Sequence, residues 1–177
     1  MILNMQELKN QPCPFCSKKT LTLIEDEKEI PYFGKCFLMS MTCTSCKYHQ
    51  ADIEVADNKG PINYTFTIKN KKDLNVRVIK SSQATVKIPQ LRMSVTPGAG
   101  SIGYISNIEG LLNRFKAIIE SQRDNSEEPS ERKAAKNLLK KLWKVELGEQ
   151  ELKIVIEDPS GNSAIVSDKA EVKKSKK

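Results

Sequence analysis

The sequence has no apolar run long enough to cross a bilayer, and its first residues lack the basic and apolar segments of a signal peptide. These absences predict a cytoplasmic protein. Histidine is also scarce, because His49 is the only one in 177 residues. With one histidine and no serine or cysteine nucleophile motif around it, a hydrolase triad has no visible basis. We therefore expect a protein that is not an enzyme.

A dense stripe of positive charge is missing too. The net charge is +7, but five lysines and two acids in the last ten residues account for +3 of it. Nucleic-acid-binding surfaces usually carry a denser basic stripe with interleaved aromatics. The sequence therefore argues against nucleic acid as the main partner without excluding it. It also predicts that the basic tail, residues 168–177, is disordered.

The sequence does have a distinctive set of cysteines. Their number, five, is odd, which argues against a disulfide framework in a cytoplasmic chain. Four of them form two C-x-x-C pairs separated by 26 residues. Each pair can turn two sulfurs toward one ion, and two pairs supply the closed tetrahedral thiolate set of a structural zinc site. The pattern predicts a zinc ribbon over residues 1–50 that holds one structural Zn²⁺ through Cys13, Cys16, Cys43 and Cys46.

Other interpretations of these cysteines are weaker. A redox C-x-x-C normally opens a helix in a thioredoxin-like setting, which the second pair lacks. Cys36 and His49 are alternative ligands, but Cys36 lies in a strand-like run and is expected in the core. His49 follows Cys46 by three residues, yet four thiolates already complete the site.

Residues 51–167 predict a β-rich domain with a helical insertion. Apolar residues alternate with polar ones, as in half-buried strands, over 64–68, 76–78, 86–88, 91–95 and 152–156, and a last short strand is expected around 165–166. Because strands and helices do not alternate regularly, the order of elements argues against a doubly wound parallel sheet and favours a sandwich or small barrel with two helices packed on it. The fold class is α+β, mainly β.

The helical insertion is expected as a hairpin over about residues 106–145. Ser106 and Glu109 have the spacing of a capping box. Behind them, two stripes of apolar residues at helical spacing predict core-facing sides. The stripes are Ile108, Leu111, Leu112, Phe115, Ile118 and Ile119 in the first helix, and Ala135, Leu138, Leu139, Leu142 and Trp143 in the second.

Two loops invite functional interpretations. The glycine-rich segment 96–103 precedes a helix, but it lacks the Gly-Lys-Ser/Thr ending of a phosphate-binding loop. Its glycines predict positive φ angles, and a partner-contacting role is a second hypothesis. The segment 158–162, with Asp158, Pro159 and Gly161, has the chemistry of a turn. Asp158 and Glu157 are therefore not interpreted as a catalytic pair.

Taken together, several motifs make the chain resemble the ZPR-type zinc-finger proteins of eukaryotes and archaea. The resemblance runs from Cys13 to about Ser167 and depends on the order and spacing of short segments. These segments are CPFC at 13–16, IPYFGK at 30–35, CTSCKY at 43–48, DLN at 73–75, VIKS at 78–81, IPQL at 88–91, NIEGLL at 107–112 and DPSGNS at 158–163.

The resemblance implies a specific architecture and partner. The family's module is a zinc ribbon followed by a double-stranded β-helix-like, or jelly-roll-like, domain with an inserted helical hairpin, and one copy resembles the archaeal form. Its implied function is to bind translation elongation factor 1-alpha, a GTPase, and to assist its folding or maturation. The alternative is a nucleic-acid-associated zinc ribbon of transcription or translation. One departure is Lys47, where the family usually has a glycine that relaxes a positive φ angle.

Overall fold

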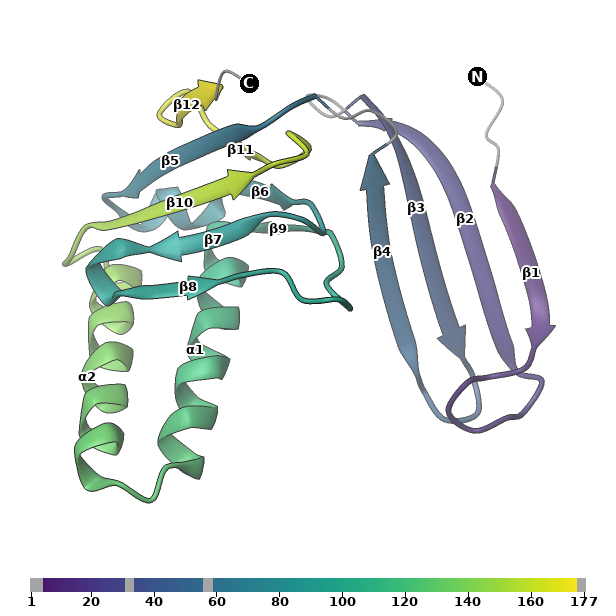
Figure 1. Cartoon of the computed structure of the whole chain (residues 1–177), viewed down its shortest axis with the longest axis horizontal. Helices are drawn as coiled ribbons and strands as arrows, with labels where there is room; N and C mark the ends of the chain where they lie inside the picture. The colour runs from purple at the N-terminus through teal and green to yellow at the C-terminus, as the bar shows by residue number, and fades with distance from the viewer. Residues whose placement is uncertain (1–4, 31–33, 56–58, 175–177) are drawn as a thin grey trace.

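A computed structural model describes residues 5–30, 34–55 and 59–174 of the chain (Figure 1). The N-terminal part is an antiparallel four-stranded sheet with the order β1-β2-β3-β4. Its strands are β1 (Gln6–Gln11), β2 (Leu21–Ile30), β3 (Gly34–Cys43) and β4 (His49–Val55). The segment between the two cysteine pairs thus forms the long β2–β3 hairpin. The domain boundary predicted at residue 50 falls inside β4, and the centre of the 30–35 motif lies outside the described residues.

The second part is built from two sheets, as a jelly-roll requires. The larger has the order β12-β5-β10-β7-β8 and the smaller β11-β6-β9. The strands are β5 (Ile62–Ile68), β6 (Arg77–Lys80), β7 (Thr85–Ile88), β8 (Met93–Val95), β9 (Tyr104–Asn107), β10 (Leu152–Asp158), β11 (Ala164–Val166) and β12 (Glu171–Lys174). Two 3₁₀ turns, Lys71–Asn75 and Pro89–Leu91, separate some of them, and the second replaces the start of the strand expected over 91–95.

Helices α1 (Ile108–Asn125) and α2 (Pro129–Glu146) form the expected hairpin, which packs on one side of the jelly-roll (Figure 1). The main core combines both helices with the sheets; Phe66, Phe115 and Leu142 are among its fully buried members. Two residues of the expected stripes are instead exposed, Ile118 by 47% and Trp143 by 56%. Neither helix in the described part of the chain is both long and apolar enough to span a membrane.

The predicted helix cap is wrong by one residue. Asn107, not Ser106, caps α1, because its side-chain oxygen accepts a hydrogen bond of 2.8 Å from the backbone N–H of Gly110. Ser106 belongs to β9, where it pairs with Val78. The strand therefore continues to the last residue before the helix, and asparagine serves as cap as well as serine does.

The expectation of a disordered tail is also wrong over the described residues. Glu171–Lys174 form β12, an exposed edge strand that pairs antiparallel with β5. Its sequence, EVKK, has one apolar residue among three charged ones and so gave no strand signal, whereas its pairing with β5 depends on backbone hydrogen bonds, which no side-chain pattern reveals.

The two parts of the chain meet along one seam. Cys36 and Ile53 of the ribbon sheet form a buried cluster with Ile79 and Ala164 of the jelly-roll. Beside this cluster, the segment between β8 and β9 reaches toward the ribbon sheet (Figure 1). There the backbone N–H of Gly103 donates a hydrogen bond of 2.8 Å to Asp52 Oδ1.

Candidate metal centre

The two cysteine pairs lie in matching turns at the end of the ribbon sheet that is distant from the seam. In each turn, the backbone N–H four residues after the first cysteine donates to that cysteine's carbonyl, at 2.8 Å for Ser17 and 3.0 Å for Lys47. Both donors have a positive φ angle, 58° at Ser17 and 62° at Lys47. The strain expected at Lys47 is therefore present, and the first turn has the same strain at a serine.

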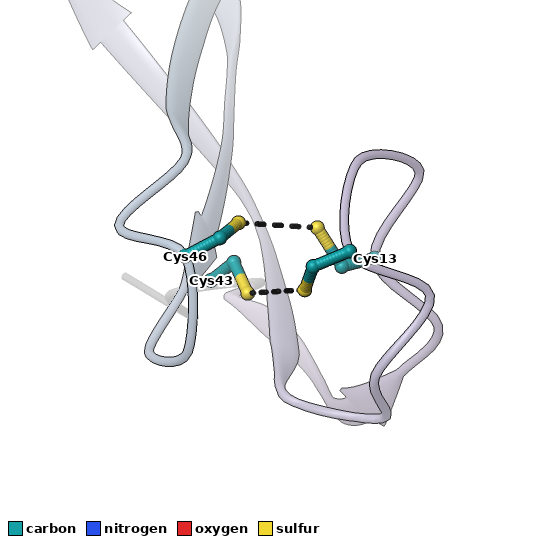
Figure 2. A group of neighbouring side chains, drawn as sticks. Cys13, Cys43 and Cys46 are labelled. Atoms are coloured by element: carbon teal, nitrogen blue, oxygen red, sulfur yellow. Dashed lines mark hydrogen bonds between the residues drawn. The ribbon is translucent and has the colours of Figure 1, made fainter.

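The turns bring the four sulfur atoms together (Figure 2). All four lie within 4.8 Å of one another, and Sγ–Sγ distances are 3.6 Å for Cys13–Cys46 and 3.8 Å for Cys16–Cys43. A tetrahedron with Zn–S bonds of about 2.3 Å has sulfur–sulfur edges of about 3.8 Å. The spacing fits, and the tetrad is positioned to bind one zinc ion. A closed set of four thiolates leaves no ligand position for water.

The surroundings of the sulfurs differ and shift the pKa values of Cys43 and Cys46 in opposite directions. Cys13 and Cys43 are buried, whereas Cys46 is exposed. Hydrogen bonds from the Cys46 backbone N–H and from the Thr20 hydroxyl lower the pKa of Cys43 to about 6. The backbone N–H of Tyr48 lowers the pKa of Cys46, but desolvation of the thiol and hydrogen bonds with the neighbouring thiols outweigh it and raise the value to about 12. Such a set is loaded with metal by releasing protons.

The two alternative ligands lie elsewhere. Cys36 is fully buried in β3 at the seam, as the sequence predicts for a core residue, and burial raises the pKa of its thiol. His49 is exposed at the start of β4, where its Nδ1 lies 2.9 Å from Thr42 Oγ1. Among the described residues, the tetrad is the single group of three or more cysteine, histidine or acidic side chains with metal-binding spacing.

An aromatic pair, Phe15 and Tyr48, lies next to the tetrad, and the sequence did not predict this pair. Phe15, between Cys13 and Cys16, is 71% exposed, and its ring centroid lies 4.4 Å from that of Tyr48. An exposed aromatic on a rigid turn is a common anchor for protein partners. The only signal in the sequence was an apolar residue inside a C-x-x-C turn, which is too weak to interpret alone.

The glycine-rich loop before β9 does not behave as predicted. None of Gly98, Gly100 and Gly103 has a positive φ angle. Gly103 is constrained by space instead, because a Cβ there would lie 2.5 Å from the backbone oxygen of Ile53. Around Gly98 and Gly100 nothing lies within 4 Å of such an atom. Gly103 therefore allows the loop to approach β4 closely, whereas Gly98 and Gly100 have free space around them.

The turn after β10 is a turn, as predicted, and it also buries a charge. Asp158 is 1% exposed and accepts hydrogen bonds from the hydroxyls of Ser160 and Ser163 and from two backbone N–H groups. Burial alone would raise the pKa of its carboxyl, but these donors lower it below its ordinary value. Ser160 and Ser163 also hydrogen-bond to Ser81, the residue after β6, so the network joins the turn to a second strand and supports a structural role.

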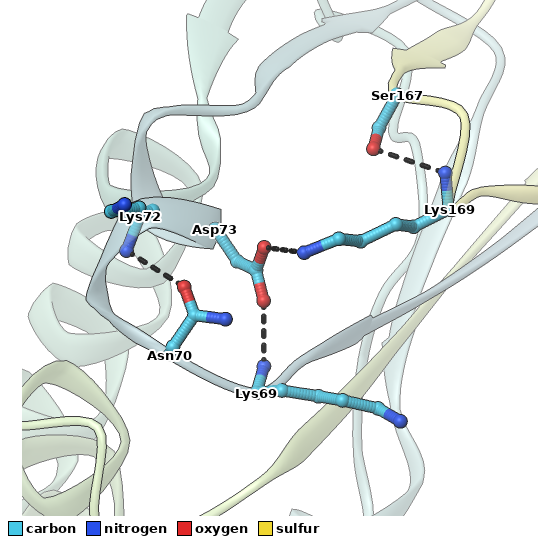
Figure 3. Close-up of polar contacts among 6 residues, drawn as sticks. All are labelled: Lys69, Asn70, Lys72, Asp73, Ser167 and Lys169. Atoms are coloured by element: carbon cyan, nitrogen blue, oxygen red, sulfur yellow. Dashed lines mark hydrogen bonds and ion pairs between the residues drawn. The ribbon is translucent and has the colours of Figure 1, made fainter.

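A second buried carboxylate, Asp73, binds Lys169 in the segment between β11 and β12 (Figure 3). Lys169 Nζ lies 2.7 Å from Asp73 Oδ1, and the Lys69 backbone N–H donates to Oδ2 at 2.9 Å. Burial opposes ionisation, yet these two donors lower the pKa of Asp73 below its ordinary value. The pair holds the segment that leads into β12.

Comparison with known proteins gives the same two-part division. Residues 5–59 match the model of the ZPR1 zinc-finger domain, and residues 72–177 match that of the ZPR1 jelly-roll domain. A ZPR1-like protein of Pyrococcus horikoshii is 34% identical over 96% of this chain and 78% of its own length. A ZPR1-like protein of Methanocaldococcus jannaschii is 32% identical over 94% of this chain and 85% of its own.

Eukaryotic relatives are longer. The zinc finger chaperone zpr1 of Schizosaccharomyces pombe is 29% identical over 77% of this chain, and the match spans 30% of the yeast protein. The zinc finger protein ZPR1 of Bos taurus is 28% identical over 86% of this chain and 34% of its own length.

Proposed function

Because this chain belongs to the ZPR1 family, with both its zinc-finger and its jelly-roll domain, we propose that it binds translation elongation factor 1-alpha and assists its folding or maturation without catalysis. The observation that carries the proposal is the match to both domains over nearly the whole chain. A yeast relative named as a zinc finger chaperone supports it.

In this proposal Cys13, Cys16, Cys43 and Cys46 hold the ion, which supplies rigidity and no chemistry. A fixed knuckle presents the Phe15 ring, 71% exposed beside Tyr48, at a defined position. Rigid aromatic anchors lose little conformational entropy on binding, so they contribute strongly to protein interfaces. We expect this ring to contact the GTPase.

The test begins with purified, metal-loaded protein and the purified GTPase. We expect a complex by isothermal titration calorimetry, weakened at least about tenfold by Phe15→Ala, because truncating an aromatic anchor typically costs more than about 1.4 kcal/mol. Val172→Ala is the matched control, since Val172 is 49% exposed on β12, far from the metal centre in the chain. Absence of any complex would refute the proposed partner.

The assisting role needs its own measurement. Newly translated GTPase should reach its protease-resistant, nucleotide-bound form faster in a cell-free system when this protein is added. The Cys43→Ser variant, which removes one member of the tetrad, should fail to accelerate it. Equal folding with and without the protein would limit the proposal to binding. If instead the protein bound RNA with a steep loss of affinity in added salt, the nucleic-acid alternative would replace it.

A further inference from the structure

A cavity of about 460 Å³ lies between the loop that precedes β9 and helix α1. This volume falls within the range of pockets that hold ligands. Apolar side chains form much of the wall: Val86, Val95, Pro97, Ile102, Leu111, Phe115 and Ile118. Ile118, one of the two stripe residues that the core leaves exposed, faces this space instead. The cavity therefore accounts for the exposure of Ile118 on the apolar stripe of α1.

Two cations line this cavity, and none of the described residues in its wall is acidic. Lys80 is 5% exposed, and its Nζ donates a hydrogen bond of 2.9 Å to the backbone oxygen of Ser81. The guanidinium of Arg114 lies 4.0 Å from the centre of the Tyr104 ring, and Lys80 Nζ lies 5.8 Å from the same ring. Of the ion pairs among the described residues, none includes Arg114 or Lys80.

The electrostatics of the cavity favour an incoming anion. Burial lowers the pKa of Lys80, the Asp158 carboxylate opposes this effect, and the charge of Arg114 adds to it. The two cations lie next to the same Tyr104 ring and repel each other, and no described residue of the cavity wall supplies a counter-charge. A carboxylate between them would relieve that repulsion and accept hydrogen bonds from both.

The other side of β9 has the opposite character. A second cavity of about 390 Å³ lies between the ribbon sheet and β9, and Tyr104 lines both cavities. Asp26 and Asp52 line the second cavity, and none of its described lining residues is a cation. Of the two cavities that Tyr104 lines, the one beside α1 is therefore the one with cations among its described lining residues. An acidic ligand has one favourable cavity, and a basic ligand would be repelled from it.

We propose that the cavity between the 96–102 loop and α1 binds a segment of a partner protein in which an acidic side chain neighbours a bulky apolar one. The carboxylate pairs with Arg114 and Lys80, and the apolar side chain packs against Phe115 and Ile118. A bare anion would leave these apolar walls in water, which is why a peptide fits the cavity better. The inference rests on the proposed function only in that the occupant belongs to a partner protein.

The direct test uses a synthetic hexapeptide with two central glutamates flanked by phenylalanine and leucine, titrated into ¹⁵N-labelled full-length protein. We expect the peptide to shift the backbone amide resonances of Tyr104, Arg114 and Ile118. The same peptide with glutamine for glutamate should bind at least about tenfold more weakly, because it forms no charge-assisted hydrogen bonds. Equal binding of both peptides, no shifts at these residues, or equal shifts from inorganic phosphate would each overturn the inference.

Matched variants locate the site. Arg114 is exposed, so Arg114→Glu should preserve the fold and weaken the glutamate peptide at least about tenfold, while Arg114→Lys should retain most of the binding. Gly100 lines the cavity and Gly98 does not, yet a side chain at either would meet nothing within 4 Å of its Cβ. Gly100→Phe should therefore block the peptide and Gly98→Phe should leave its affinity unchanged. Equal effects of these two variants would contradict the assigned site.

Repeating the Arg114→Glu comparison with the elongation factor separates this inference from the proposed function. A GTPase that binds the wild-type protein and the variant equally supports the function and refutes this cavity as its contact. A glutamate peptide that binds while the GTPase does not supports the cavity and refutes the named partner.

Discussion

Backbone strain at Lys47 lowers the stability of the turn that holds the second cysteine pair. The φ angle of Lys47, 62°, is in the left-handed region, which costs a residue with a Cβ about 1 kcal/mol. Lys47→Gly removes that cost, partly offset by the greater freedom of glycine in the unfolded chain. We expect the ribbon to gain about 0.5 kcal/mol and to hold zinc correspondingly tighter, measured by competition with a chromophoric chelator.

Lys18→Gly is the control for that measurement, because Lys18 lies in the first turn without a positive φ angle. There glycine adds only unfolded-state freedom, so the affinity for zinc should fall slightly. The interpretation of Lys47 as strained would be wrong if both glycine variants shifted the affinity in the same direction.

The buried carboxylate of Asp158 should make the free energy of unfolding depend on pH. Its folded-state pKa lies below the ordinary value of 3.8, so its ionised form stabilises the fold above about pH 4, and this contribution disappears as the pH falls through the lowered pKa. Asp158→Asn should cost about 2–4 kcal/mol at pH 7, because four donors lose a charged acceptor.

Urea unfolding of wild type and Asp158→Asn between pH 7 and pH 2.5 measures this dependence. The difference in unfolding free energy should be constant above about pH 5 and shrink below pH 4. Glu157→Gln provides the comparison, since the Glu157–Lys87 pair is partly exposed and worth little. A difference that did not change with pH would assign the effect of Asp158 to packing.

The sequence predicted the strands and turns that a local residue pattern determines. The cysteine spacing placed the ribbon turns, and alternation over 64–68 and 152–156 located β5 and β10, because half-buried strands expose every second side chain. Non-local features escaped prediction. β12 has no apolar pattern, and the cavity at Lys80 and Arg114 depends on how β6 meets α1, which no sequence window contains.

Gly103 illustrates why the seam between elements could not be predicted. Its glycine signal suggested a special φ angle, but the actual constraint is the Ile53 carbonyl of β4, about fifty residues away in sequence. Gly103→Ala would place a Cβ 2.5 Å from that oxygen, so the seam must open. We expect a loss of about 1–3 kcal/mol in stability and faster amide exchange at Asp52–Val55 by mass spectrometry.

The matched variant for the seam is Gly100→Ala, in the same loop, which has nothing within 4 Å of the added atom. It should leave amide exchange in β4 unchanged. If Gly103→Ala also left it unchanged, the seam observed between Asp52 and Gly103 would have no part in holding the ribbon to the jelly-roll.

At the scale of the whole molecule, the two ends of the ribbon sheet are stabilised in different ways, and the jelly-roll has a separate hydrophobic core. One end of the ribbon sheet packs on the jelly-roll through Cys36 and Ile53. The other end has only a small cluster around Cys13, Leu21 and Cys43, too little apolar area to hold the turns without metal. The large core of sheets and helices contains none of these residues.

Removing the metal should therefore unfold the molecule in part and in a defined order. With a strong chelator we expect amide protection to vanish first near Leu21, Cys43 and His49, later near Cys36 and Val55, and not in α1, whose helical circular dichroism persists. Wild type and Cys36→Ala should each contain one equivalent of zinc by elemental analysis, and Cys43→Ser far less, because Cys36 lies outside the tetrad. A ribbon that kept its protection near Leu21 after metal removal, or zinc lost from Cys36→Ala alone, would show that the four sulfurs do not determine its fold.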